Sequence, residues 1–138
     1  MAIALDPYLN FRGNAREAME FYREVFGGEL TVATFADFHA SSDPGEDGLV
    51  MHSYLEGPEG IRFMAADVPR RMEFRPGTNF SMSLSGDDET ALRRYFEKLS
   101  EGGSVLQPLE KAPWGDTFGM CADRFGITWL VNISAPRG

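Results

Sequence analysis

The sequence has 138 residues, of which 43% are hydrophobic and 12% aromatic, and its formal net charge is −8 at pH 7. This length and apolar content are typical of one compact domain and unlike a disordered segment. The acidic balance speaks against nucleic acid and anionic membranes as partners, because both are recognised through basic surfaces. A single cysteine, Cys121, excludes an intrachain disulfide and is expected to be buried in a strand. No apolar run is long enough to span a bilayer, so the expected location is the cytoplasm.

The first half of the chain predicts a strand, a helix and three further strands. In the strand expected over residues 5–11, Leu9 and Phe11 fall on one face, with Tyr8 and Asn10 on the other. The next segment begins with Asn14-Ala-Arg-Glu17, the spacing of a capping box. The predicted helix therefore starts after Asn14 and ends at Gly27-Gly28, and the further strands are expected at 29–36, 49–56 and 61–66. The polar loop over residues 37–48 is interpreted as a flexible insertion.

The second half predicts the same elements in the same order. Apolar and serine side chains alternate from Phe80 to Ser85, which predicts a strand with its serines on the face away from the helix. Asp87 or Asp88 is expected to cap the second helix. The last three strands are expected at 103–109, 117–122 and 127–133, with residues 123–126 as a tight turn.

An internal repeat links the two halves. Phe21-Tyr22 is matched by Tyr95-Phe96, 74 residues later, and Gly27-Gly28 is matched by Gly102-Gly103, 75 residues later. Self-similarity of this kind indicates two copies of one structural plan. The chain is therefore divided into a first module (1–68), a basic crossover (69–77) and a second module (78–138).

Three segments carry a resemblance to a known family: PYLNF, GNAREAMEFYREVFGGEL and WGDTFGMCADRFGITWLVN. In order and spacing they resemble the PhnB-like branch of the vicinal-oxygen-chelate superfamily, which includes glyoxalase I, extradiol dioxygenases and bleomycin-resistance proteins. The resemblance implies an α+β fold of two βαβββ modules that form a curled, cup-shaped mixed sheet with the helices on its outer face. It also implies a homodimer. Some PhnB-like members carry a ubiquinone-methyltransferase label, but no glycine-rich loop after a strand supports that activity here.

The resemblance also locates the positions of a metal site. Metal-dependent relatives use two His and two Glu, from the first and last strands of each module, to hold an ion that polarises the substrate. The matching positions here are Asp6, Arg62 or Met64, Asn79 and Leu130. Leucine and methionine offer no hard oxygen ligand, and arginine repels a cation. Neither a metal nor a cofactor is therefore expected.

Strand alternation and the resemblance together select residues that would line a ligand cavity. Several have ordinary alternatives: His52 as a satisfied strand histidine, Trp114 as core packing against Phe118, and Arg62 as a partner of Glu56 or Glu59. Asn132 is expected to bond local backbone. The predicted lining is Tyr8, Asn10, His52, Tyr54, Arg62, Asn79, Ser81, Ser83, Trp114, Phe118 and Leu130.

Three functions are compatible with these patterns. The leading hypothesis is metal-independent binding of an unidentified small molecule. The second is a metal-dependent lyase, isomerase or dioxygenase with a displaced site built on His52 and either Asp6 or Asp67. The third is a structural or interaction protein without a ligand. The sequence contains no motif for a catalytic nucleophile, so no catalytic residue is assigned.

Overall fold

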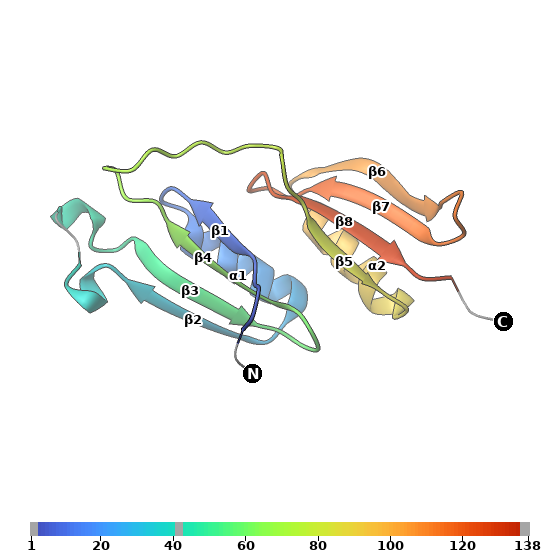
Figure 1. The fold of residues 1–138 in the computed structure, drawn as a ribbon, viewed down its shortest axis with the longest axis horizontal. Helices are drawn as coiled ribbons and strands as arrows, with labels where there is room; N and C mark the ends of the chain where they lie inside the picture. The colour runs from blue at the N-terminus through green and yellow to red at the C-terminus, as the bar shows by residue number, and fades with distance from the viewer. Residues whose placement is uncertain (1–2, 41–42, 136–138) are drawn as a thin grey trace. The chain divides into compact units, whose positions relative to one another are not determined.

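The computed structural model describes residues 3–40 and 43–135. The chain divides after Pro76 into two compact units, and each unit contains a strand, a helix and three more strands in that order (Figure 1). The division lies within the predicted crossover. The α+β fold of two βαβββ modules, predicted from the repeat and the resemblance, is confirmed. None of the described helices is long and apolar enough to cross a membrane.

The first module is a four-stranded mixed sheet with one helix. The strands lie in the order β1-β4-β3-β2, and β1 is parallel to β4 while the other neighbours are antiparallel. The elements are β1 (Tyr8–Phe11), α1 (Ala15–Phe26), β2 (Glu29–Thr34), β3 (Val50–Glu56) and β4 (Arg62–Asp67), with short 3-10 helices η1 (Ala36–Phe38) and η2 (Pro44–Glu46) between β2 and β3.

The second module repeats this connectivity. Its strands lie in the order β5-β8-β7-β6, with β5 parallel to β8 and the other neighbours antiparallel. The elements are β5 (Met82–Gly86), α2 (Glu89–Ser100), β6 (Ser104–Lys111), β7 (Thr117–Ala122) and β8 (Thr128–Ile133).

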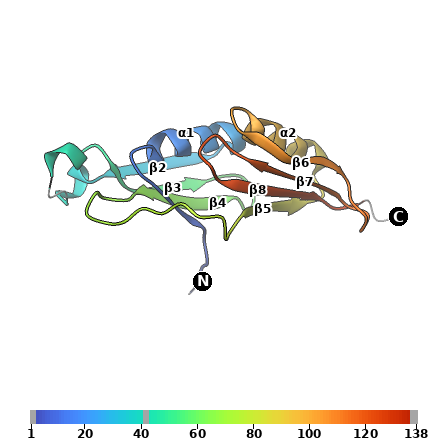
Figure 2. The ribbon, with the colours of Figure 1, turned by 90° about the horizontal axis from the view of Figure 1, so that it is seen from above.

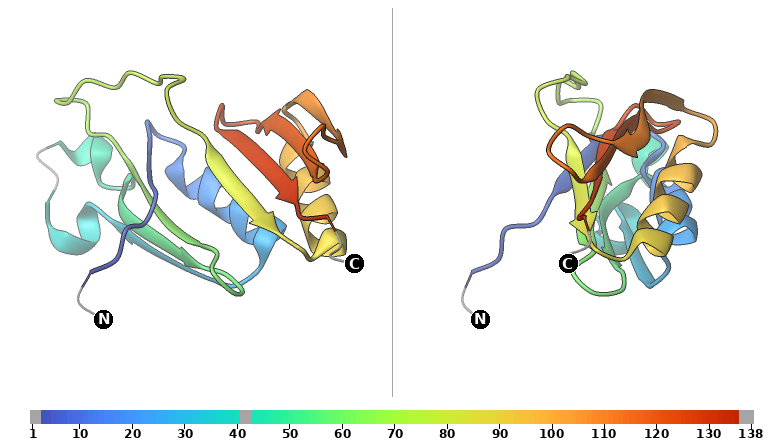
Figure 3. Two further views of the ribbon diagram at one scale, coloured as in Figure 1. Left: turned by 45° about the vertical axis from the view of Figure 1, so that its right-hand side comes forward. Right: turned by 90° about the vertical axis from the view of Figure 1, so that its right-hand side faces the viewer.

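In each module the helix covers one face of its own sheet (Figures 2 and 3). The apolar stripe of α1 is buried against strand residues, and the ring of Phe63 lies 5.4 Å from that of Tyr22 and 6.2 Å from that of Phe26. In the second module, α2 buries Leu92, Tyr95, Phe96 and Leu99, and the sheet buries Cys121, Trp129 and Val131. Burial of these aliphatic and aromatic side chains is the main stabilising contribution to each unit. The predicted burial of Cys121 is confirmed.

Capping of the two helices differs from one module to the other. Asp88 caps α2 as predicted, because its carboxylate accepts a hydrogen bond from the Ala91 N–H at 3.1 Å. The capping box predicted for α1 is wrong, since the Asn14 side chain makes no capping bond. Asp67 replaces it: Oδ1 accepts from the N–H groups of Gly13 (2.7 Å) and Ala15 (3.0 Å). This carboxylate reaches the start of α1 from the end of β4.

Two further sequence predictions need correction, one about strand ends and one about a loop. Strands β1 and β5 are shorter than predicted and begin at Tyr8 and Met82, so Phe80 lies outside the strand and is 52% exposed.

The loop predicted to be a flexible insertion is anchored at its second half. There, the buried Glu46 carboxylate accepts from the Arg70 N–H at 2.7 Å, and Asp43 forms an ion pair with the Arg70 guanidinium at 3.1 Å. Residues 41–42 of this loop lie outside the described residues.

Candidate functional site

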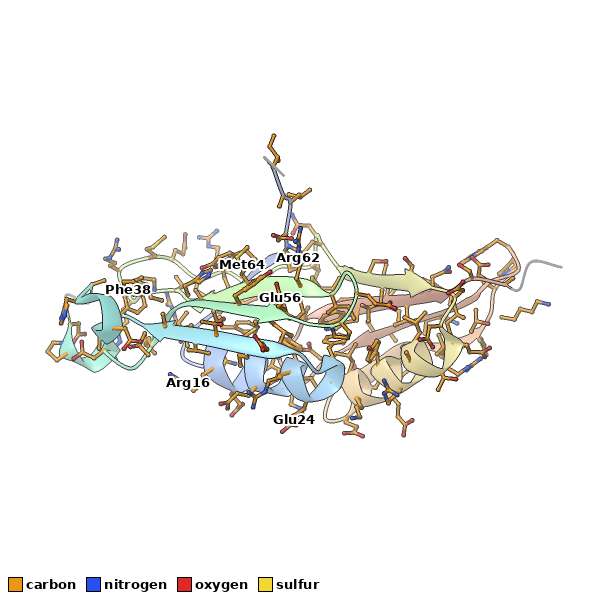
Figure 4. The ribbon with its side chains drawn as sticks, turned by 90° about the horizontal axis from the view of Figure 1, so that it is seen from below. Arg16, Glu24, Phe38, Glu56, Arg62 and Met64 are labelled. Carbon is orange, nitrogen blue, oxygen red and sulfur yellow. The ribbon has the colours of Figure 1, made fainter. Side chains whose placement is uncertain are left out.

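The first sheet has one face packed on α1 and one face free of it. Along β3, Ser53 and Leu55 are fully buried, while the alternate residues His52, Tyr54 and Glu56 are more exposed. Figure 4 shows Glu56, Arg62 and Met64 on the side of the sheet opposite Arg16 and Glu24 of α1. We call this side the open face of the first sheet; its predicted site residues are Tyr8, Asn10, His52, Tyr54 and Arg62.

Strand register places these side chains in transverse rows. Tyr8 of β1 lies opposite Met64 of β4, which in turn lies opposite Tyr54 of β3. In the next row, Arg62 lies opposite Glu56. The open face thus carries an aromatic and thioether row beside a charged one.

Arg62 forms an ion pair with Asp6, the residue two positions before β1. The Nε atom donates to Asp6 Oδ1 at 2.8 Å, and the two side chains are 43% and 18% exposed. The sequence-based pairing of Arg62 with Glu56 or Glu59 is therefore wrong. The bond joins Asp6, one expected ligand position of the first module, to Arg62, which with Met64 is a candidate for the other.

His52 has a partner that strand spacing alone does not reveal. The Tyr8 hydroxyl lies 3.4 Å from His52 Nδ1, and the ring centroids are 5.9 Å apart. A tyrosine hydroxyl is protonated at neutral pH and can donate to the imidazole, and partial burial raises the pKa of the Tyr8 phenol further. The two side chains form a polar pair on the open face.

The second sheet also has a face free of its helix. Ser83 lies opposite Leu130, and Leu130 lies opposite Met120. The row beside it runs through Ser85, Asn132, Phe118 and Glu110. We call this side the open face of the second sheet. Two predicted lining residues, Asn79 and Ser81, are exposed and precede β5 rather than belonging to it.

The turn between β6 and β7 brings Trp114 to the open face of the second sheet. The indole is 62% exposed, and its ring lies 5.7 Å from that of Phe118 at an interplanar angle of 63°. The alternative that Trp114 is core packing is therefore wrong. The expectation that Asn132 bonds local backbone is also wrong, because its Nδ2 donates to Asp116 Oδ2 at 3.0 Å. Asp116, absent from the predicted site, also accepts the Ala135 N–H at 2.9 Å.

These hydrogen bonds predict that the Asp116 carboxyl titrates at a lower pH than an ordinary aspartate. The bond from Asn132 and then that from Ala135 hold the pKa of this carboxyl below its ordinary value of 3.8. The stability that these bonds contribute is thus complete above the ordinary pKa and is lost as the pH falls through the lower folded value. We expect carbon-detected NMR to give a midpoint below 3.8 for Asp116, and a higher one in Asn132→Ala. Identical midpoints in the two proteins would show that Asn132 does not stabilise the carboxylate.

Comparison with protein families gives a match over residues 4–131 to the glyoxalase/bleomycin resistance protein/dioxygenase superfamily. The chain belongs to this superfamily. Protein PA1353 from Pseudomonas aeruginosa is similar in structure, with a TM-score of 0.82 and 34% identity over 98% of this chain and all of that one. A PhnB protein from Bacillus cereus has a TM-score of 0.70 and 27% identity, over 96% of this chain and all of that one, which supports the PhnB-like branch. Escherichia coli protein YjdN is 25% identical over 94% of both chains.

Metal-dependent members of the glyoxalase superfamily need oxygen or nitrogen ligands that are free to bind an ion. Here Asp6 is engaged by Arg62, and the Leu130 side chain has no donor atom. Asp67, considered for a displaced site, directs its oxygens to the backbone N–H groups of Gly13, Ala15 and Val50. Across residues 3–40 and 43–135, no group of three or more His, Cys, Asp and Glu side chains is placed to hold a metal. The residues at the expected positions do not fit a divalent cation.

Proposed function

We propose that this member of the glyoxalase superfamily binds a small molecule on the open faces of its sheets without a metal ion. The observation that carries the proposal is the ion pair between Asp6 and Arg62, because it binds the one carboxylate at an expected ligand position to a cation. A guanidinium beside Asp6 opposes a second positive charge there. Tyr8, His52 and Tyr54 on the same face supply aromatic surface and hydrogen-bonding groups, the combination that orients small ligands.

Metal loading tests the metal-independent part of the proposal. Protein purified without a tag is incubated in parallel with Mn²⁺, Ni²⁺, Zn²⁺ and Fe²⁺, desalted, and measured by elemental analysis. We expect far less than one ion per chain and an unchanged Tm for the wild type. In Arg62→Glu the guanidinium is replaced by a carboxylate beside Asp6, so metal retention should rise above that of both the wild type and the neutral control Arg62→Ala. Near-stoichiometric metal in the wild type would contradict the proposal and support the metal-dependent alternative.

A fragment screen tests the binding part. Backbone amide NMR spectra are recorded with a set of neutral and charged small molecules. We expect saturable shifts at residues of the open faces, including Tyr8, His52 and Tyr54. Shifts confined to the helix-covered sides, or none for any compound, would favour a structural or interaction role instead.

We also propose that the protein is a homodimer and that it is located in the cytoplasm, as the sequence predicts. Sedimentation equilibrium of the full chain tests the first of these, since a dimer has twice the chain mass of 15.3 kDa. A single species at the chain mass would contradict it.

A further inference from the structure

The turn that carries Trp114 is held by backbone hydrogen bonds. The Ala112 N–H donates to the Asp116 carbonyl at 2.7 Å, and the Gly115 N–H donates to the Ala112 carbonyl at 2.9 Å. Gly115 has a φ of +102°, a conformation that glycine adopts without steric cost. A turn closed in this way fixes where the Trp114 backbone points, so the exposed indole is presented by a defined element.

Trp114 and Phe118 together form an aromatic corner. Their rings meet edge to face, with centroids 5.7 Å apart, so one side of the indole is supported while 62% of the residue remains exposed. Phe118 itself belongs to the open face of the second sheet, opposite Asn132 and Glu110. We propose that this aromatic corner binds a planar aromatic ring of the small molecule by stacking on Trp114. The inference rests on the proposed function, because it assigns a ligand class to one of its two faces.

Polar groups near the aromatic corner indicate which charge and substituents the ligand should have. Glu110 lies opposite Phe118 in the strand register, and the Asp116 carboxylate accepts a hydrogen bond from Asn132, which also lies opposite Phe118. Hydrogen bonds from Asn132 and Ala135 favour the ionised form of Asp116. Negative charge disfavours an anionic ligand and favours donor groups such as a hydroxyl or an amine. The ligand class is therefore a neutral or cationic planar aromatic molecule with at least one hydrogen-bond donor.

A matched pair of probes separates stacking from general hydrophobic binding. 2-Naphthol and decahydro-2-naphthol have similar size and one hydroxyl at the same ring position, but only the first has an aromatic face. The full chain labelled with ¹⁵N has two tryptophans, so their indole N–H signals report the corner (Trp114) and the core (Trp129) separately. Trp114→Phe assigns the signals, and N-acetyltryptophanamide provides the affinity of an isolated indole for each probe.

We expect 2-naphthol to shift the Trp114 signal saturably, more tightly than it binds N-acetyltryptophanamide, and to bind about 2- to 12-fold more tightly than the saturated probe. Phe118→Leu removes the ring that supports the indole and should weaken 2-naphthol binding toward its affinity for N-acetyltryptophanamide, while an unchanged Trp129 signal shows that the fold is kept. Equal affinity for the two probes, or an affinity no better than that of the isolated indole, would overturn the inference. If 2-naphthol shifts only residues of the first sheet, the aromatic corner is refuted while small-molecule binding stands.

Discussion

Replacing Asp67 by asparagine is expected to lower the free energy of unfolding by about 2–3 kcal/mol. The Asp67 side chain is 4% exposed, and its two oxygens accept three backbone N–H groups, from Gly13, Ala15 and Val50. Asparagine keeps one oxygen and replaces the other with an amide NH₂, which cannot accept. At least one buried backbone donor is then left without a partner and faces another donor. The loss affects the start of α1 and the start of β3 together, so the first module should unfold more readily.

Urea denaturation followed by circular dichroism measures this change in free energy. The matched control is Asp87→Asn, since the exposed Asp87 side chain forms no hydrogen bond with any residue that the structure describes, and that variant should stay within about 0.5 kcal/mol of the wild type. If Asp67→Asn were as stable as Asp87→Asn, the carboxylate would not be the cap that the geometry assigns.

Local periodicity is enough to predict most of the helices and strands. Alternation around Leu9 and Phe11 identifies β1, and the stripe containing Tyr22 and Phe26 identifies the buried side of α1. The matching glycine pairs indicate the duplication from the sequence alone. Such signals work because the periods of strands and helices are properties of the backbone itself, so a few consecutive residues reveal them.

Contacts between distant residues cannot be predicted in the same way. Asp67 caps α1 from 52 residues away, Arg62 bonds Asp6 across 56 residues, and Tyr8 meets His52 across 44. Each depends on parallel pairing of β1 with β4 or on side chains that lean along the sheet, neither of which leaves a local pattern. The capping box at Asn14 and Glu17 is a valid local signal, but a buried carboxylate with three donors supplies the stronger acceptor.

The two faces differ although the two sheets share one topology. On the first sheet Arg62, in the last strand of its module, forms an ion pair with Asp6, whereas the matching strand of the second sheet presents Leu130 and Asn132. The duplicated frame thus fixes where side chains point but not their chemistry. Family membership therefore identifies the fold, whereas the chemistry of each open face depends on the particular residues that it carries.

The same duplication predicts which two glycines of the fold tolerate substitution least. A Cβ added at Gly28 would lie 2.2 Å from the carbonyl oxygen of Glu56, at the end of β3. A Cβ added at the matching Gly103 would lie 2.1 Å from the carbonyl oxygen of Ala122, at the end of β7. Both distances are far below van der Waals contact, and both obstacles are backbone atoms of a paired strand. In each module the chain leaving the helix passes against the neighbouring strand at a position that only glycine fits.

Gly103→Ala is therefore expected to lower the free energy of unfolding by about 1–3 kcal/mol. Gly103 does not have a positive φ, so the effect would come from the close approach and not from backbone strain. Gly60→Ala is the matched control, because its added Cβ meets no atom within 4 Å and its φ is likewise not positive, and it should be neutral or slightly stabilising. Gly28→Ala should be at least as harmful as Gly103→Ala, since its φ of +94° adds strain to the clash. Thermal and urea unfolding of the three variants measure these differences. Equal stability of Gly103→Ala and Gly60→Ala would show that the end of β7 moves away from the added Cβ without loss of stability.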